Sequence, residues 1–208
     1  MRKLAVVLAL ACSSAAWAQT GELWFNFGES RLADNGIGTE NLSPFGGPVS
    51  GATGNDVQLN SGWRFSFRFG FNQGDHFGHE IQYAYNRTAL QINAPPADAS
   101  TTGMAIHQGG YNFLYYILTS DKSRIRPFVT VGAMFDDFVP PGASAGYGGG
   151  SNKFGGNFGG GMKIHIKGIW AGRVDVREYV SGKPSFGFAL NSGALWQTEI
   201  SAGVGIGF

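Results

Sequence analysis

A run of alternating aromatic residues constrains the fold of this chain more than any other feature of its sequence. Between residues 63 and 71, every second position is aromatic: Trp63, Phe65, Phe67, Phe69 and Phe71. The positions between them are Arg64, Ser66, Arg68 and Gly70. Because successive side chains of a β-strand point to opposite faces, this period of two predicts a strand with one apolar face and one polar face.

The same period recurs along the chain, notably in Trp170–Arg177 and in Ile200–Phe208. Eight segments are predicted to be strands: Glu22–Ser30, Gln58–Asn72, Phe77–Leu90, Thr102–Thr119, Arg126–Phe138, Lys153–Ile166, Ile169–Val180 and Leu195–Phe208. The segment Thr102–Thr119 alternates less cleanly than the others, which predicts a β-bulge within it.

The composition favours strands and an apolar surrounding. Glycine makes up 34 of the 208 residues, which disfavours helices because each glycine costs up to about 1 kcal/mol relative to alanine there. Charged residues account for only 14% of the chain, too few to cover the aqueous exterior of a soluble barrel or a β-sandwich, the two alternatives. The net charge is +1 and no basic cluster follows Arg2 and Lys3, so no nucleic-acid partner is expected.

The connections between the predicted strands alternate in length. The longer ones are 32–57, 91–101, 139–152 and 181–194, and the shorter ones are 73–76, 120–125 and 167–168. Transmembrane barrels have short periplasmic turns, longer extracellular loops and an even number of strands. Past residue 18 no apolar run approaches the roughly 18 residues of a transmembrane helix. We therefore predict an all-β fold: a closed antiparallel eight-stranded transmembrane up-and-down β-barrel.

The N-terminal segment has the features of an export signal. Arg2 and Lys3 precede the apolar run Leu4–Ala11, and Ala16 and Ala18 form the small-x-small pattern of a cleavage site. We expect residues 1–18 to be a cleaved signal peptide and residues 19–208 to form one outer-membrane barrel domain. A buried N-terminal helix is the alternative. The only cysteine lies within residues 1–18, so the mature chain would contain no disulfide and no thiolate metal ligand.

We assign the polar face of the predicted strands to the lumen and the aromatic face to lipid, because small and polar side chains suit a narrow barrel interior. The expected interior residues are Asn26, Arg64, Arg68, Glu80, Gln82, Asn86, Asn112, Lys163, His165, Arg173, Asp175, Arg177, Gln197 and Glu199. The charged members of this set, Arg64, Arg68, Glu80, Lys163, Arg173, Asp175, Arg177 and Glu199, are expected to form a lumen network. We interpret it as an ion-pair plug. The alternative is a narrow, weakly anion-preferring pore lined by the surplus arginines.

No motif in the sequence supports catalysis, a metal site or a cofactor site. The segment Gly142–Gly146 matches the pattern G-x-S-x-G, but its neighbours have the composition of a loop and not of the strand and helix that a nucleophile elbow needs. Asp136 and Asp137 end a predicted strand, so we interpret them as a solvated rim. The His-x-Ser pair of lipid-deacylating barrels is absent. We therefore expect no enzyme, no metal and no cofactor.

Three stretches of the chain resemble the OmpA-like outer-membrane β-barrel domain family. Ile125–Ala133 is similar to the RPYVGAG strand of that family, and the glycines of Gly159–Ile164 lead into Arg173–Tyr179 as in its last hairpin. The terminal Phe208 is similar to the C-terminal signal that the outer-membrane assembly machinery reads. The resemblance implies a bacterial outer-membrane location, outer-membrane lipids around the barrel, and periplasmic chaperones and the assembly machinery as partners during biogenesis. We expect the chain to end at the barrel, so cell-wall anchoring is not carried over.

The expected function is a structural or surface-interaction role through the extracellular loops. These loops contain few aromatic residues that could bind a partner: Phe45, Tyr147, Phe186 and Phe188. A narrow passive pore is the first alternative, and a lipid-modifying barrel enzyme is the second.

Deleting Phe208 is expected to impair insertion into the outer membrane more than any deletion in the long connections, because the last strand loses its terminal aromatic residue. The measurement is the amount of chain in outer-membrane fractions, with a deletion of residues 142–146 as the control. Equal amounts of the truncated and the unaltered chain would contradict the prediction.

Overall fold

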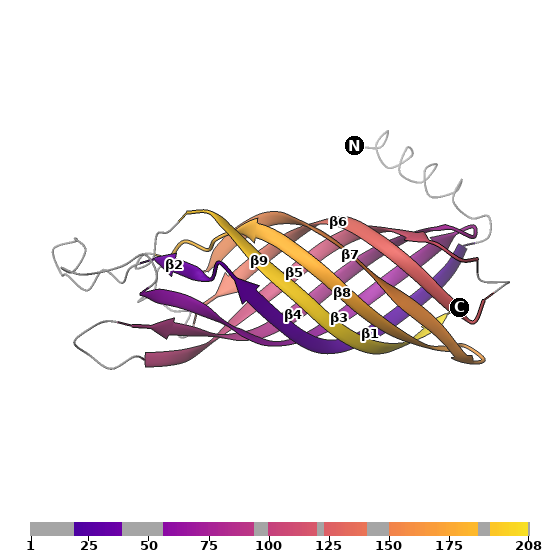
Figure 1. Ribbon diagram of the computed structural model, residues 1–208, viewed down its shortest axis with the longest axis horizontal. Helices are drawn as coiled ribbons and strands as arrows, with labels where there is room; N and C mark the ends of the chain where they lie inside the picture. The colour runs from indigo at the N-terminus through magenta and orange to yellow at the C-terminus, as the bar shows by residue number, and fades with distance from the viewer. Residues whose placement is uncertain are drawn as a thin grey trace, which may run out of the picture.

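The computed structural model is an antiparallel β-barrel (Figure 1). The structure describes residues 19–38, 56–93, 100–119, 123–140, 150–186 and 192–207. Its strands are β1 (Gln19–Ala33), β2 (Gly36–Gly38), β3 (Val57–Gln73), β4 (Phe77–Ile92), β5 (Ser100–Tyr116), β6 (Ile125–Val139), β7 (Ser151–Lys167), β8 (Trp170–Gly182) and β9 (Ala194–Gly207). Among these described residues, no helix is long and apolar enough to cross a membrane.

The sheet closes on itself. Each long strand pairs with its neighbours in the order β1, β9, β8, β7, β6, β5, β4 and β3, and β1 also pairs with β3. The short strand β2 pairs with β3 alone among the described strands. The predicted closed barrel of eight antiparallel strands is confirmed, and the ends of these strands differ from the predicted ones by three residues or fewer.

The two ends of the barrel differ. At one end, called here the turn end, β3 joins β4 and β7 joins β8 through tight turns, and β1 begins and β9 ends there (Figure 1). Gly74 and Gly168 lie in these turns with φ values of 63° and 60°, a left-handed conformation that glycine adopts without steric cost. The opposite end, the loop end, carries β2 and the longer connections.

The prediction of a bulge in Thr102–Thr119 is wrong. The described part of this segment, β5, keeps one continuous register with both β4 and β6. Its pattern is irregular because its inner face carries apolar side chains, including Met104 and Leu114, as well as polar ones. A register shift occurs instead between β3 and β4, where Ser61 and Gly62 lie opposite a single residue of β4.

The outer face of the barrel is apolar and aromatic, as predicted. Exposed large side chains on this face include Phe25, Phe27, Trp63, Phe67, Ile81, Tyr83, Phe113, Val131, Phe158, Trp170, Val176, Trp196 and Ile200. Neighbouring rings pack edge to face across strands, as between Phe25 and Phe67, whose centroids lie 5.0 Å apart. Water would oppose the exposure of so many apolar side chains on one continuous surface, whereas lipid favours it.

Glycines on the inner face let the strands and the lumen side chains approach closely. A Cβ atom at Gly159 in β7 would collide with the carbonyl oxygen of Val176 in β8. A Cβ atom at Gly203 in β9 would collide with the side chain of Asn26 and the carbonyl of Phe25 in β1. The space left by these missing side chains is therefore used by the longer side chains of the lumen.

Substituting Phe67 with Arg is expected to destabilise the folded barrel by about 2–4 kcal/mol, because the guanidinium would face lipid near the middle of the membrane. Phe67 is 39% exposed on the outer face. Urea unfolding in phospholipid vesicles measures the free energy, and Phe67→Leu is the matched control. Equal stability of the Arg and Leu variants would show that this face does not contact lipid.

Candidate functional site in the barrel lumen

The centre of the lumen holds a buried layer of ion pairs around Asp175 of β8. Its carboxylate oxygens lie 2.9 Å from Arg68 Nη1, 2.7 Å from Arg173 Nε and 3.0 Å from Arg177 Nη2. All four side chains are fully excluded from solvent. Three guanidinium groups thus share one carboxylate. Two of them belong to Arg173 and Arg177, which lie two positions before and after Asp175 on the same face of β8.

A second carboxylate, Glu80, reaches the same arginines from across the barrel. Its oxygens lie 2.6 Å from Arg173 Nη1 and 2.9 Å from Arg177 Nη2, and it also accepts a hydrogen bond of 3.2 Å from Asn112 Nδ2. Glu80 belongs to β4, which lies four strands from β8 in either direction around the barrel. These ion pairs therefore span the lumen and connect opposite walls.

Glu199 of β9 is the third carboxylate of the layer. It lies 3.1 Å from Arg64 Nε and 2.5 Å from Arg68 Nη2, and it accepts a hydrogen bond of 2.6 Å from the hydroxyl of Tyr179. The guanidinium of Arg64 also lies 4.6 Å from the centre of the Tyr179 ring. Each guanidinium of the layer is thereby paired with at least one carboxylate, as buried charges require.

Lys163 forms a separate ion pair nearer the turn end. Its Nζ pairs with Glu22 of β1 and donates a hydrogen bond of 2.5 Å to the Tyr116 hydroxyl. Glu22 accepts two more hydrogen bonds, of 2.9 Å from Trp24 Nε1 and 2.7 Å from Asn72 Nδ2. Of the eight charged residues expected in one lumen network, seven therefore form the central layer, and the eighth, Lys163, pairs separately with Glu22.

Two acidic residues of the lumen were missed by the sequence analysis. Asp136 is 1% exposed and accepts a hydrogen bond of 2.7 Å from Gln108 Nε2, so its interpretation as a solvated rim is wrong. The strand continues past it, so Asp136 points inward while Asp137 points outward. Glu22 lies on the same face of β1 as the expected interior residue Asn26, and this spacing of four residues could have identified it.

When Asp136 and Glu22 are counted, the lumen no longer has the expected surplus of cations. The buried charged side chains of the described lumen, taken with Glu22, are five cations and five carboxylates. The cations are Arg64, Arg68, Lys163, Arg173 and Arg177, and the carboxylates are Glu22, Glu80, Asp136, Asp175 and Glu199. The anion preference predicted for a pore was based on surplus arginines, and the buried lumen does not contain them.

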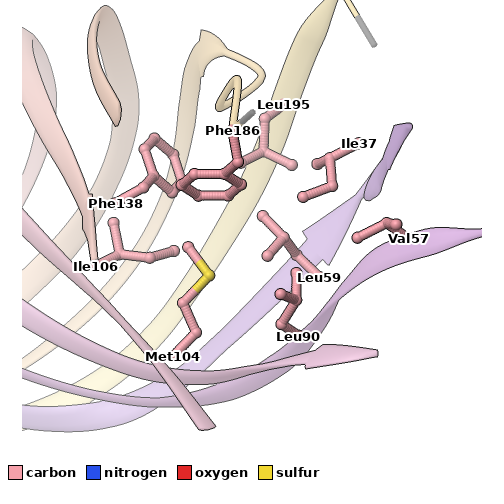
Figure 2. Packing of buried hydrophobic residues seen from close by; sticks show 9 residues of the cluster. All are labelled: Ile37, Val57, Leu59, Leu90, Met104, Ile106, Phe138, Phe186 and Leu195. Carbon is pink, nitrogen blue, oxygen red and sulfur yellow. The ribbon is translucent and has the colours of Figure 1, made fainter. Parts of the chain in front are cut away.

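The interior is not polar throughout, in contrast to the expectation. At the loop end, nine apolar side chains pack together inside the barrel (Figure 2): Ile37, Val57, Leu59, Leu90, Met104, Ile106, Phe138, Phe186 and Leu195. Phe186, which was expected to be a loop residue available to a partner, is only 2% exposed in this cluster. A smaller cluster of Leu114, Tyr116 and Phe128 lies toward the turn end.

The remaining expected lumen residues, with one exception, are buried. Asn26, Gln82, Asn86, Asn112 and Gln197 are no more than 3% exposed, and Gln197 Nε2 donates hydrogen bonds to Ser30 Oγ and Asn86 Oδ1. The exception is His165, which is exposed at the turn end because β7 extends there beyond the buried layers. The expected cleavage residues Ala16 and Ala18, the terminal Phe208, and Phe45, Tyr147 and Phe188 lie outside the described residues.

The geometry of the lumen suits closure better than chemistry. Each carboxylate of the central layer is occupied by guanidinium groups, so none is free to exchange a proton with a substrate. No group of His, Cys, Asp and Glu side chains within the described residues could hold a metal ion. What the network can do is fill the lumen and connect its walls.

Comparisons with known proteins place the barrel in a family. The sequence matches the family model described as the outer membrane protein beta-barrel domain over residues 4–208. The chain belongs to this family. It is an outer-membrane β-barrel protein of Gram-negative bacteria. In outer-membrane barrels the short turns face the periplasm, so the turn end is the periplasmic end and the loop end is the extracellular end.

Solved structures of small outer-membrane barrels share the fold. The outer membrane protein OprG from Pseudomonas aeruginosa has a TM-score of 0.57 and 14% identity, covering 90% of this chain and 96% of that one. Neisserial surface protein A has a TM-score of 0.56 and 15% identity, covering 90% and 97%. At sequence identities this low, the similarity shows a shared fold alone. No curated protein matches the sequence.

Substituting Asp175 with Asn is expected to destabilise the folded barrel by about 3–5 kcal/mol, because three buried guanidinium groups lose their shared carboxylate. The matched control is Glu29→Gln, which breaks an ion pair of 3.0 Å between side chains that are 50% and 61% exposed. That change is expected to cost less than about 1 kcal/mol. Urea unfolding in phospholipid vesicles measures both, and equal losses would show that the buried layer does not stabilise the barrel.

Proposed function

We propose that this protein is a non-conducting barrel with a structural or surface-interaction role at its extracellular end. The observation that carries the proposal is the filling of the lumen by successive layers of buried side chains. A role in transport through the barrel would require a continuous water-filled path, and the described side chains occupy that path.

The layers follow one another along the barrel axis. At the extracellular end, Leu59, Met104 and Phe138 of the apolar cluster are 0% exposed. In the middle, Arg68 and Arg177 are also 0% exposed. A side chain that lines a water-filled pore contacts water, so the exclusion of solvent from two successive layers supports a closed lumen.

Opening the lumen would cost free energy because it would break these ion pairs. Widening the lumen would separate Glu80 on β4 from Arg173 and Arg177 on β8. In surroundings of low dielectric constant, separated charges lose most of their attraction and recover no hydration unless water enters. The layer is therefore expected to stay closed in the resting protein and not to open transiently.

The apolar cluster also supports a role for the extracellular end. It includes Ile37 of β2 and Phe186 of the segment after β8, both from connections at this end (Figure 2). These side chains fix the bases of two connections to the barrel wall. A rigid base positions extracellular loops for contact with a partner at the cell surface, while lipid surrounds the barrel wall below.

The protein purified from outer membranes and inserted into a planar bilayer is expected to show no discrete conductance steps. The double variant Glu80→Ala/Arg177→Ala, which removes one cation and one carboxylate from the central layer, is expected to produce small, reproducible steps. The control Glu29→Ala/Arg31→Ala removes an outward-facing pair and should remain silent. Reproducible steps from the unaltered protein would refute the proposal and favour the narrow pore.

A further inference from the structure

A basic cavity opens at the periplasmic mouth of the barrel, on the side of Lys163 that faces the periplasm. Its volume is about 300 Å³, and its lining includes Glu22, Trp24, Arg124, Arg126, Lys163 and His165. We propose that this cavity binds the phosphate group of a small periplasmic ester or of a lipid headgroup. The inference is independent of the proposed function, because a closed lumen above the cavity neither requires nor prevents a ligand there.

Cationic residues face one another across two strands in this cavity. Arg126 of β6 lies directly opposite Lys163 of β7 in the strand register. The next inward positions toward the periplasm are Arg124 and His165, which are also neighbours, since the amide of His165 donates to the carbonyl of Arg124. Like charges directly opposite in an antiparallel pair are destabilising, and an anion between them would relieve that repulsion.

The two arginines are held in place without being neutralised. Arg124 donates hydrogen bonds to the backbone carbonyls of His165 and Ile166, at 2.9 and 3.1 Å. Arg126 donates one of 3.0 Å to the carbonyl of Asp75. Among the described residues, no carboxylate lies within ion-pair distance of either guanidinium. Backbone acceptors thus fix both side chains while their positive charge remains available to a ligand.

The one carboxylate among the described residues of the lining is already occupied. Glu22 pairs with Lys163 and accepts hydrogen bonds from Trp24 and Asn72. It therefore balances Lys163 and leaves the two guanidinium groups in excess. The net charge of the described lining residues is therefore positive even when His165 is neutral.

The donor groups of the cavity favour a compact and multiply charged oxyanion. The guanidinium carbon of Arg126 lies 3.9 Å from the centre of the Tyr116 ring, and this cation–π contact helps to hold the side chain in place. Guanidinium groups bind phosphate through two parallel hydrogen bonds. A carboxylate offers two acceptor oxygens, whereas a phosphate monoester offers three and a larger charge. Two fixed guanidinium groups with a neighbouring histidine and lysine therefore match phosphate better.

The test is calorimetric titration of inorganic phosphate into the protein, purified from outer membranes in non-ionic detergent at low ionic strength. Saturable binding is expected, and the double variant Arg124→Ala/Arg126→Ala should weaken it at least tenfold. Arg31→Ala removes an exposed cation from the outer face and should change the affinity less than twofold. No saturable binding, or equal affinity in the double variant, would overturn the proposal.

Two further variants guard against a folding defect. Arg124 is exposed at the mouth, so Arg124→Ala alone should leave the barrel folded, as judged by its heat-modifiable electrophoretic mobility, and still weaken binding several-fold. Arg126→Lys keeps the charge but loses the planar pair of donors, so its affinity should fall between those of the unaltered protein and the double variant. Unchanged affinity in both variants would also overturn the proposal.

Two comparisons identify the source of the phosphate. If a lipid headgroup occupies the cavity, the affinity for inorganic phosphate should fall at least tenfold in nanodiscs that contain phosphatidic acid, whose headgroup is a phosphate monoester, relative to detergent. If the natural ligand is a soluble ester, the affinity should be the same in both, and glycerol 3-phosphate should bind at least as well as inorganic phosphate. Acetate that binds as tightly as phosphate would contradict the assignment to phosphate.

Discussion

The structure depends on guanidinium–carboxylate pairing across the lumen. Asp175 and Glu80 share the arginines of β8, and Glu199 adds the arginines of β3. Because β4 and β8 lie on opposite sides of the barrel, these pairs hold the walls at a fixed separation. A single missing partner would leave a buried charge without compensation, at a cost of several kcal/mol. The network therefore requires the closed barrel, and it also stabilises that barrel.

The outer face of the barrel wall contacts lipid and the inner face lines the lumen, and the period of two in the sequence produces both faces. Outward, rings such as Phe25 and Phe67 pack against each other and meet lipid. Inward, glycines such as Gly159 and Gly203 leave room for long arginine side chains. Closure satisfies the backbone hydrogen bonds of every long strand, which lipid could not do for an open edge. A chain with few charges can fold in this way because, within the part of the chain that the structure describes, all ion pairs except that of Glu29 and Arg31 lie inside.

The lumen is asymmetric along its axis. Its extracellular end is closed by apolar side chains that include Phe186 and Ile37 (Figure 2), whereas its periplasmic mouth is an open and basic cavity. An apolar plug excludes water and ions, while a cationic mouth attracts anions from the periplasm. The asymmetry supports the proposal of a non-conducting barrel whose two ends act separately.

The sequence by itself determined the strands, their alternation and the closed barrel, because a period of two and alternating connection lengths are local properties that the chain displays directly. It also placed Arg64, Arg68, Glu80 and Asp175 on the inner face. It did not reveal which charges pair, because Glu80 and Arg177 meet across the lumen only after closure and register are set. Nor did it reveal the buried position of Asp136, the apolar cluster at the extracellular end or the exposure of His165. Those features depend on how far each strand extends and on which side chains face it across the barrel, and only the tertiary structure determines both.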